Sequence, residues 1–362
     1  MTLTIKQLPE LVSKLPPAQR RVFRRIFYVD CVKGELELSR NMLARVEAQF
    51  GSIESVRKQD IVKIENLITG EGTIYNPLRS LRPHNYRYRC IENISGSGMS
   101  EEDLFVRPME NTPEDLFGRI KGKYCITASN IAKYEQYHCV IIFRNTDPLD
   151  FNCDEVADYI DTAWRWMKKA NRFDKAAKYG MFLWNCASRA GASIAHGHAQ
   201  AIIGRGSHYT RVQRLYQAAV EYKNKYNSDY FRDLFELHGA LGLGWQRGNV
   251  RIMSYLTALK QNEVMLLGKN VDSKLEESIY SVLAGFRDKL GVKSFNLGLI
   301  LPPFQAEDGW QGFPVITRVV DRGDTTDLSS DIGAMEFYGA SVVSSDPFHT
   351  AAVLMDDTFE KS

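Results

Sequence analysis

The chain has 362 residues, of which 44% are hydrophobic, enough to bury the core of two domains or of one large domain. Its 46 Lys and Arg nearly balance its 44 Asp and Glu, so no overall charge favours nucleic acid or a membrane surface as a partner. The six cysteines include no C-x-x-C pair, and no apolar run approaches the roughly 20 residues of a membrane span, which favours a cytoplasmic globular protein.

The first third of the chain is expected to form an N-terminal extension, residues 1–120, helical at first and then stranded. Residues 1–70 have mainly helical patterns, and ENLITGEGTIYN (65–76) predicts two short strands around a turn that contains glycine. The basic run RRVFRRIF (20–27) could contact RNA, although a solvated helix face is the more ordinary explanation for one short run. Residues 95–118 are polar and rich in Ser, Glu and Pro, which favours a surface loop.

The pattern from Tyr124 onward predicts a first complete unit, for which we take the bounds 121–207. Short apolar runs flank one long amphipathic helix, which begins where Asn152 and Glu155 have the spacing of a capping box. The order is strand, strand, helix, strand, strand. The predicted strands are YCITASN (124–130), HCVIIF (138–143), YGMFLWN (179–185) and SIAHGHAQAII (193–203).

The same order returns in residues 250–320, within a second unit for which we take the bounds 250–362, after a connector at 208–249 that is predicted to be helical. Ser273 and Glu276 give a second capping pair, and we therefore expect an α+β fold of two fused units, each an antiparallel sheet with a packed helix. The predicted strands of this unit are VRIMSYLTAL, EVMLLG, SFNLGLIL and FPVITRVV. Aligning FPVITRVV with HGHAQAII sets Phe313, Val315 and Thr317 opposite the polar residues of the first unit.

The stretch SIAHGHAQAII places His196, His198 and Gln200 at alternate positions, with only Gly197 and Ala199 between them. On a strand, these three polar side chains share one face, and the small residues on the other face let a helix approach closely. Three polar side chains are costly to bury without partners. We therefore expect this face to border a cavity or a ligand.

Three kinds of site are compatible with such a face. The side chains could be satisfied members of a polar sheet, or the two histidines could bind zinc, although two ligands do not complete a zinc site. The third kind is catalytic, because an imidazole nitrogen can attack phosphorus and form a covalent phosphoramidate. A neighbouring imidazole or a backbone carbonyl can fix the tautomer, and the amide of Gln200 can donate to a phosphoryl oxygen.

The wider stretch NCASRAGASIAHGHAQ (185–200) resembles the active-site signature of the histidine-triad superfamily, in its transferase branch. That branch holds galactose-1-phosphate uridylyltransferase, ADP-glucose phosphorylase and the diadenosine tetraphosphate phosphorylases. The resemblance extends to DIGAMEFYGASVVSSDPFHTAAVL (331–354) and implies two fused histidine-triad-like units, of which only the first carries the histidines. The matching positions of the signature are Asn185, Gly191, Ser193, His196, His198 and Gln200.

The resemblance implies a ping-pong nucleotidyl transfer through a covalent nucleotidyl-histidine. His198 aligns with the family's nucleophile, which attacks the α-phosphorus of a nucleotide. His196 aligns with a histidine that supports the geometry of the site or, in zinc-containing relatives, binds the metal. Gln200 replaces the third histidine of the hydrolase branch, and this replacement goes with transfer to a phosphate acceptor in place of water.

The resemblance assigns the remaining site residues to substrate binding. Ser193 and the backbone near Gly191 would hold phosphate oxygens, and Asn185 would order this loop or contact ribose and phosphate. Asn130 resembles an asparagine that lies near the base and ribose in relatives. His138, at the start of a predicted strand, is expected to be structural.

The chain departs from the zinc-containing relatives at the positions that bind the metal. It has no C-x-x-C, and Asp147 stands where a histidine ligand would be, so we expect no metal and no cofactor. Gly197 stands where the uridylyltransferases usually have proline. These departures weaken the case for galactose 1-phosphate as a substrate, but they leave the nucleophile in place.

We therefore expect an enzyme that moves a nucleoside monophosphate between a nucleoside diphosphate sugar and phosphate or a sugar 1-phosphate. The alternatives are a dinucleoside polyphosphate phosphorylase and a nucleotide-binding protein that has lost turnover. The expected partners are a nucleotide or nucleotide-sugar substrate and a phosphate-bearing acceptor, with no nucleic acid and no membrane. Because members of the family are often dimers, we also expect a homodimer.

Overall fold

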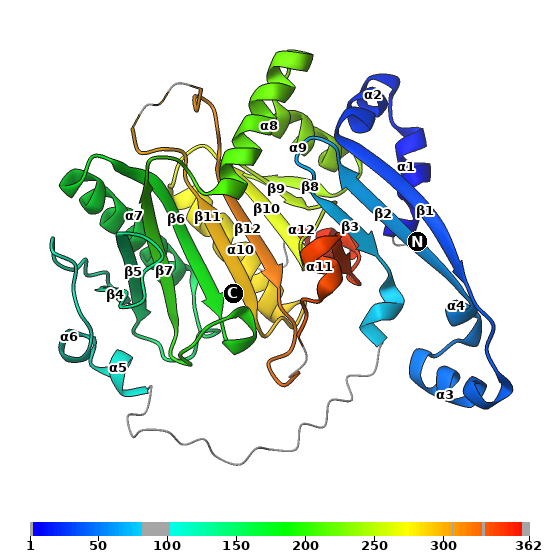
Figure 1. Ribbon diagram of the computed structural model, residues 1–362, viewed down its shortest axis with the longest axis horizontal. Coiled ribbons are helices and arrows are strands. Elements are labelled where there is room, and N and C mark those ends of the chain that lie inside the picture. Colours follow the sequence, from blue (N-terminus) through cyan, green and yellow to red (C-terminus); the bar gives the residue numbers. More distant parts are fainter. Residues whose placement is uncertain (1–2, 82–101, 306, 308, 328–329, 357–362) are drawn as a thin grey trace.

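A nine-stranded sheet forms the centre of the computed structural model, which describes residues 3–81, 102–305, 307, 309–327 and 330–356 (Figure 1). Every neighbouring pair in this sheet runs antiparallel. In spatial order the strands are β4 (Cys125–Ser129), β5 (Tyr137–Phe143), β7 (His198–Arg205), β6 (Ala177–Cys186), β11 (Phe295–Ile300), β12 (Val315–Asp321), β10 (Gln261–Gly268), β9 (Val250–Ser254) and β8 (Gly244–Arg247).

Two units meet in the middle of this sheet, where β6 pairs with β11. From this seam outward, the first unit runs β6, β7, β5, β4 and the second runs β11, β12, β10, β9, so the two orders match strand for strand. Each unit also has one long helix between its second and third strands along the chain, α7 (Cys153–Phe173) and α10 (Ser273–Asp288). The expected α+β fold of two fused units is confirmed.

The helices α7 and α10 cover the same face of the sheet and close the larger core. The predicted capping box opens α7: Asn152 accepts a hydrogen bond from the N–H of Glu155 at 3.0 Å, and the Glu155 carboxylate accepts one from the N–H of Asn152 at 2.9 Å. In α10 the cap is Asp272, one residue earlier than predicted, because its carboxylate accepts from the N–H of Leu275. Both helices and the sheet contribute large apolar side chains to this core, among them Ile160, Trp166, Trp184, Ile279, Leu283 and Leu297.

The opposite face of the sheet is covered differently in its two halves (Figure 1). On the second unit, an N-terminal four-stranded sheet and several helices form another core, in which Ile64 and Tyr75 pack with Met265 and Ile316. On the first unit, the described residues that lie over this face belong to the short helices α5 (Glu102–Val106) and α6 (Pro108–Asn111), and Phe105 packs against Ile142. The face that carries His198 and Gln200 therefore has a thin cover.

The remaining elements are those of the N-terminal sheet and of the connecting segments. The N-terminal sheet has the order β1-β2-β3-β13, with bounds β1 (Phe27–Glu35), β2 (Lys58–Asn66), β3 (Gly72–Tyr75) and β13 (Ser341–Val343). The other helices are η1 (Ile5–Gln7), α1 (Leu8–Lys14), α2 (Pro17–Ile26), α3 (Arg40–Phe50), α4 (Ile53–Arg57), η2 (Pro77–Leu81), η3 (Ser188–Ala190), α8 (Thr210–Tyr226), α9 (Tyr230–Ala240), α11 (Ala334–Tyr338) and α12 (Pro347–Met355).

The N-terminal part of the chain is less helical than its sequence predicts, because β1 and β2 are nine residues each and pair along their whole length. Of the predicted loop at 95–118, residues 95–101 lie outside the described residues, and α5 and α6 follow in the rest. The short β13 pairs in parallel with β3, so the C-terminal segment also reaches the N-terminal sheet. The boundaries at 120, 207 and 249 stay predictions.

The sequence alignment of the two units is wrong by one residue in β12. Val315 packs in the core beneath α7 and α10, whereas Ile316 packs on the opposite face. Because side chains alternate along a strand, Thr317 faces the helices and is not the counterpart of Gln200. Arg318 lies on the face that corresponds to that of Gln200.

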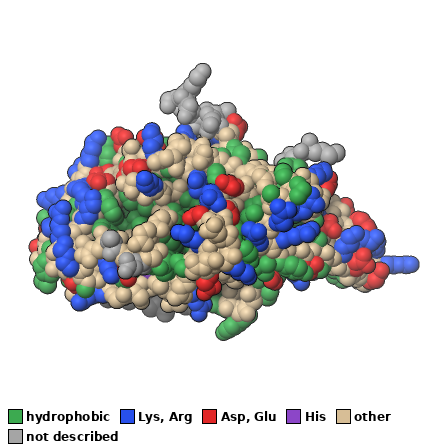
Figure 2. Space-filling model, turned by 90° about the horizontal axis from the view of Figure 1, so that it is seen from above, with side chains coloured by type: hydrophobic (Ala, Val, Ile, Leu, Met, Phe, Trp, Pro, Cys, Tyr) green, Lys and Arg blue, Asp and Glu red, His purple; other side chains and the backbone are tan. Residues whose placement is uncertain are grey.

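The surface carries both signs of charge. On the face that Figure 2 shows, Lys and Arg side chains lie among Asp and Glu side chains, in keeping with the near balance of charge in the sequence. Within the ranges that the structure describes, no helix combines the length and the apolar character that crossing a membrane requires.

Candidate active site

The predicted histidine strand is in fact part loop and part strand. β7 begins at His198, so residues 193–197 lie in the loop that follows η3. The reason is the close packing of Gly197 against a turn, where its N–H donates to the carbonyl of Thr146 at 2.8 Å. A Cβ at this position would lie 2.9 Å from the carbonyl oxygen of Asn145, so only glycine allows this approach.

The imidazole of His198 is held in one tautomer by the backbone. Its Nδ1 lies 2.8 Å from the carbonyl oxygen of His196. A carbonyl can only accept, so Nδ1 carries the proton and the Nε2 of the neutral ring has a free lone pair. Burial lowers the pKa of His198 below its ordinary value, which favours this neutral form. Nε2 has no hydrogen-bond partner among the described residues.

The imidazole of His196 is fixed in the same manner by a neighbouring strand. Its Nε2 donates to the carbonyl oxygen of Phe143, at the end of β5, at 2.8 Å. Both histidine rings also meet the edge or face of Phe105 from α5, with centroid distances of 5.7 Å to His196 and 5.4 Å to His198. Phe105 thus forms an apolar wall of the site, a contact that the sequence does not predict.

Gln200 lies two residues beyond His198 on β7, on the same face, and is joined to the neighbouring strand β5. Its Oε1 lies 2.8 Å from Nε2 of His138, which is fully buried. Asn130 is close by, with Nδ2 3.1 Å from the same imidazole nitrogen. Two of the predicted residues, Gln200 and Asn130, therefore meet at a third residue, His138, which the sequence analysis assigned to structure alone.

Asn185 lies near the end of β6 and is joined to the second unit across the seam. Its Oδ1 accepts a hydrogen bond from Nδ2 of Asn296, on β11, at 2.8 Å. The same amide group of Asn296 donates to the carbonyl oxygen of Ala190 in η3, also at 2.8 Å. Asn296 therefore holds both the side chain of Asn185 and the loop that follows it, a role that the sequence analysis did not predict.

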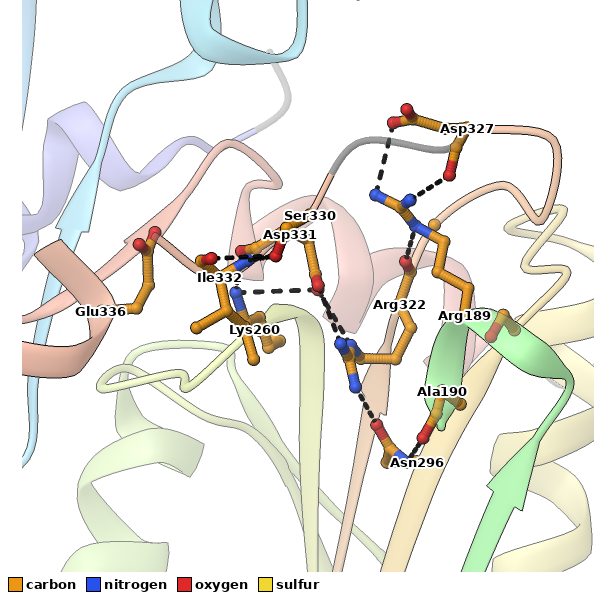
Figure 3. A network of polar contacts seen from close by, with 12 residues as sticks. Arg189, Ala190, Lys260, Asn296, Arg322, Asp327, Ser330, Asp331, Ile332 and Glu336 are labelled. Atoms are coloured by element: carbon orange, nitrogen blue, oxygen red, sulfur yellow. Dashed lines mark hydrogen bonds and ion pairs between the residues drawn. The ribbon is translucent and has the colours of Figure 1, made fainter. Parts of the chain in front are cut away.

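A network of ion pairs extends this support into the C-terminal segment (Figure 3). Arg322 donates to Oδ1 of Asn296 at 2.6 Å and makes two hydrogen bonds to the carboxylate of Asp331, at 2.9 and 2.8 Å. Arg189 of η3 donates to the carbonyl oxygen of Arg322 at 2.6 Å and pairs with Asp327. The second unit thus holds the loop between β6 and β7 at two points. Asn296 binds the carbonyl oxygen of Ala190, and Arg322 and Asp327 bind the side chain of Arg189.

Gly191 and Ser193 lie at the open side of this loop. Gly191 has a φ of +92°, in the region that favours glycine, and nothing lies within 4 Å of a Cβ built there. The side chain of Ser193 is exposed, and its hydroxyl has no hydrogen-bond partner in the part of the chain that the structure describes. Both positions are accessible to a ligand, and their role in binding phosphate stays a prediction.

A cavity of about 390 Å³ opens beside His196. Phe105, Ile126 and Ile142 give it an apolar wall, and Lys121 and Arg144 are the charged residues of its lining. Neither cation forms an ion pair with a described residue. A cleft with an apolar wall and two unpaired cations suits a ligand that has both an aromatic part and phosphate groups.

The described residues at the positions of the expected metal ligands are engaged in other contacts. Nε2 of His196 is engaged by a carbonyl oxygen, and Asp147 accepts a hydrogen bond from the N–H of Leu149 within a turn. Over the described ranges, no group of three or more His, Cys, Asp or Glu side chains is placed to hold a metal ion. That the protein works without a metal or cofactor stays a prediction.

Comparisons by sequence alone give no assignment, because no protein-family model and no curated protein matches the chain. Comparison of the fold is informative. An ADP-glucose phosphorylase from Arabidopsis thaliana with bound ADP-glucose has a TM-score of 0.60 at 14% identity, over 81% of this chain and 97% of that one.

Two further solved structures have the same fold. A GalT-like protein from Arabidopsis thaliana has a TM-score of 0.57 at 15% identity, over 71% of this chain and 92% of its own. A uridylyltransferase has a TM-score of 0.55 at 16% identity, over 81% of this chain and 97% of its own. The chain therefore shares its fold with an ADP-glucose phosphorylase, a GalT-like protein and a uridylyltransferase, in keeping with the resemblance seen in its sequence.

Proposed function

We propose that the protein is a nucleotidyltransferase that works in two steps through a covalent nucleotidyl-His198. The observation that carries this proposal is the hydrogen bond from Nδ1 of His198 to the carbonyl oxygen of His196, at 2.8 Å, which leaves Nε2 unprotonated. In the first step, Nε2 attacks the α-phosphorus of the donor, and the bond from that phosphorus to the bridging oxygen breaks. The leaving group departs as a phosphate or sugar phosphate anion.

The nucleotidylated imidazole carries a positive charge, since Nδ1 keeps its proton while Nε2 is bound to phosphorus. The carbonyl oxygen that accepts from Nδ1 stabilises this charge. In the second step, an oxygen of the acceptor phosphate attacks the same phosphorus and the P–N bond breaks. His198 then returns to its neutral tautomer without any net transfer of protons to the protein.

Two primary amides are available to bind the phosphoryl oxygens during these steps. The oxygens of Gln200 and Asn185 accept hydrogen bonds within the protein, from His138 and Asn296 respectively. Their NH₂ groups have no partner among the described residues, so they are free to donate to a ligand. Donors held in place before the reaction cost no reorganisation as charge develops on phosphorus.

The substrate class that we propose is a nucleoside diphosphate sugar, with phosphate or a sugar 1-phosphate as the acceptor. Its support is the cavity beside His196, whose lining combines an apolar wall with Lys121 and Arg144, and the fold shared with a phosphorylase solved with ADP-glucose. We also propose the cytoplasmic location and the homodimer that are expected from the sequence. Sedimentation or light scattering would measure the oligomeric state.

The proposal is tested by covalent labelling. Incubation with α-³²P-labelled ADP-glucose, UDP-glucose, UDP-galactose, GDP-mannose and diadenosine tetraphosphate, without an acceptor, is expected to label the protein from at least one nucleotide sugar. The adduct is expected to be labile in acid and stable in base, as a phosphoramidate is. Label from diadenosine tetraphosphate alone would favour the dinucleoside polyphosphate phosphorylase. Binding of a donor without any label would overturn the enzymatic assignment.

The pH dependence of labelling is the second prediction. Burial lowers the pKa of His198 below the ordinary 6.5, and only the neutral ring is nucleophilic. The pH at which the initial rate of labelling falls to half of its plateau is therefore expected to lie below 6.5, the ordinary pKa of histidine. A half-maximal rate at a pH above 6.5 would contradict the assignment of a depressed pKa to the nucleophile.

A further inference from the structure

We propose that His138 is a positioning residue of the phosphoryl-transfer site, which orients the amide of Gln200 so that its NH₂ group meets the substrate. This inference rests on the proposed function. A primary amide is a donor at one end and an acceptor at the other, and free rotation would present either end. An amide oxygen turned toward a phosphoryl oxygen would repel it, so the orientation of Gln200 decides whether it helps or hinders the reaction.

The tautomer of His138 follows from its two ring contacts. The backbone N–H of Tyr134 donates to Nδ1 at 3.0 Å, so Nδ1 is an acceptor and the proton of the neutral ring lies on Nε2. Nε2–H then donates to the atom that lies 2.8 Å away, Oε1 of Gln200. The oxygen of this amide is thereby engaged, and the NH₂ group is the end that remains for a ligand.

Asn130 does not compete for this hydrogen bond. Its Oδ1 accepts from the N–H of Ala132 at 2.9 Å, which fixes the orientation of its own amide. The Nδ2 that lies 3.1 Å from Nε2 of His138 is consequently a donor beside a donor, a contact and not a hydrogen bond. The interaction between His138 and Gln200 is the one that satisfies both groups.

The surroundings of His138 keep it neutral. Its ring is fully buried and stacks on Tyr134, with a centroid distance of 4.6 Å. Burial lowers the pKa of His138, and the nearby Lys133 acts in the same direction, against Asp115 and the hydrogen bond to Gln200. A second proton on the ring would have to sit on Nδ1, directly against the N–H of Tyr134.

The second unit provides an internal comparison. Gln200 is paired with Val140 of β5, and His138 stands two residues before Val140. Arg318 is paired with Met265 of β10, and Glu263 stands two residues before Met265. Thus Glu263 and Arg318 occupy the cross-strand positions of His138 and Gln200.

The two pairs are used differently. The Arg318 guanidinium donates from Nε to Glu263 at 2.5 Å and from Nη1 to Glu71 of the N-terminal segment at 2.5 Å, so two protein carboxylates hold it in place, while its buried Nη2 has no partner among the described residues. In the first unit the pair is neutral, and no described protein group takes the NH₂ of Gln200. Equivalent positions in the fold thus hold a structural ion pair in the second unit and, in the first unit, an oriented NH₂ group that is available to a ligand.

A double-mutant cycle tests the inference. His138→Leu is expected to lower the rate of labelling and kcat by about 10-fold to 100-fold, the loss expected when a hydrogen bond to a phosphoryl oxygen is weakened. The KM for the nucleotide substrate is expected to change little. Gln200→Ala is expected to cause a similar loss. Because His138 acts through Gln200, the double variant should be no slower than Gln200→Ala alone. Multiplying losses would overturn the inference.

A conservative variant and a direct measurement separate positioning from folding. His138→Gln places an amide NH₂ near the position of Nε2 and is expected to restore the rate to within about 5-fold of the wild type, as rescue of one hydrogen bond implies. In the unmodified protein, ¹⁵N NMR of the imidazoles is expected to show a neutral ring protonated on Nε2, a signal absent from His138→Gln. Protonation on Nδ1 would contradict the inference even if every variant failed to fold.

The outcomes also distinguish this inference from the proposed function. If the wild-type protein takes no label from any donor, the proposed function fails and the rates of the variants are not defined, but the NMR signal still reports the tautomer. If the wild type is labelled and His138→Leu is labelled at the same rate, only the positioning role fails.

Discussion

Replacing His198 with glycine is expected to abolish the covalent adduct and to lower turnover by a factor on the order of 10⁴ to 10⁶, the scale seen when a nucleophile is removed. The reason is that the bond to phosphorus is assigned to Nε2 of His198, which the hydrogen bond from Nδ1 to the carbonyl oxygen of His196 leaves unprotonated and which has no partner among the described residues. The measurement is the amount of acid-labile label after gel filtration, together with kcat for the donor identified in the panel.

The matched control is His349→Ala. His349 is exposed on α12 and belongs to none of the contacts described for the site, so this variant is expected to keep both label and turnover. Calorimetric titration should show that His198→Gly still binds the donor, since the cavity and the two amides remain. Undiminished label in His198→Gly would mean that another group is the nucleophile.

Replacing Arg318 with alanine is expected to lower the free energy of unfolding by about 3 kcal/mol or more, the usual cost of leaving a buried carboxylate without its partner. Glu263 is buried and accepts from Arg318 at 2.5 Å, and Glu71 accepts from the other side of the same guanidinium. Burial opposes the charge of Arg318, but the two carboxylates outweigh burial and raise its pKa. Urea denaturation followed by circular dichroism measures the change.

Two comparisons make the stability result specific. Adding Glu263→Gln to Arg318→Ala is expected to recover part of the loss, because a neutral amide is cheaper to leave unpaired than a carboxylate. Lys14→Ala removes the exposed pair between Lys14 and Glu10 and is expected to leave the free energy of unfolding almost unchanged, because water screens an exposed ion pair. An Arg318→Ala variant as stable as Lys14→Ala would show that this cluster is not a structural ion pair.

The architecture was predictable from the sequence wherever helix caps and alternation are strong. Asn152 and Glu155 marked the start of α7, and the repeated order of elements revealed the fused units. The register of β12 was not predictable, because Val315 and Ile316 are both buried and the strand has apolar residues on both faces. A strand that is buried on both sides has no alternation from which to infer its orientation.

The candidate site was predictable only where its residues are close in sequence. His196, His198 and Gln200 stand in one short segment, and their residue types indicate phosphoryl chemistry. His138 and Asn296 reach the site through strand pairing, and a single sequence does not reveal which strands are neighbours. Both are nevertheless recognisable in the sequence as candidates, since each is a polar residue in an otherwise apolar predicted strand. Phe105 is not, because it lies in a polar segment predicted to be a loop.

The seam between β6 and β11 makes the copy without histidines indispensable to the copy that has them. Asn296 stands directly opposite Asn185 in the register of this seam. A truncated protein with the first unit alone would lack Asn296, the partner of Asn185. It would also expose the backbone of β6 as a free sheet edge, which is prone to pair with other chains. An insertion of one residue between Phe295 and Asn296 would turn Asn296 toward the helices. The site therefore depends on the register of β11 as well as on its side chains.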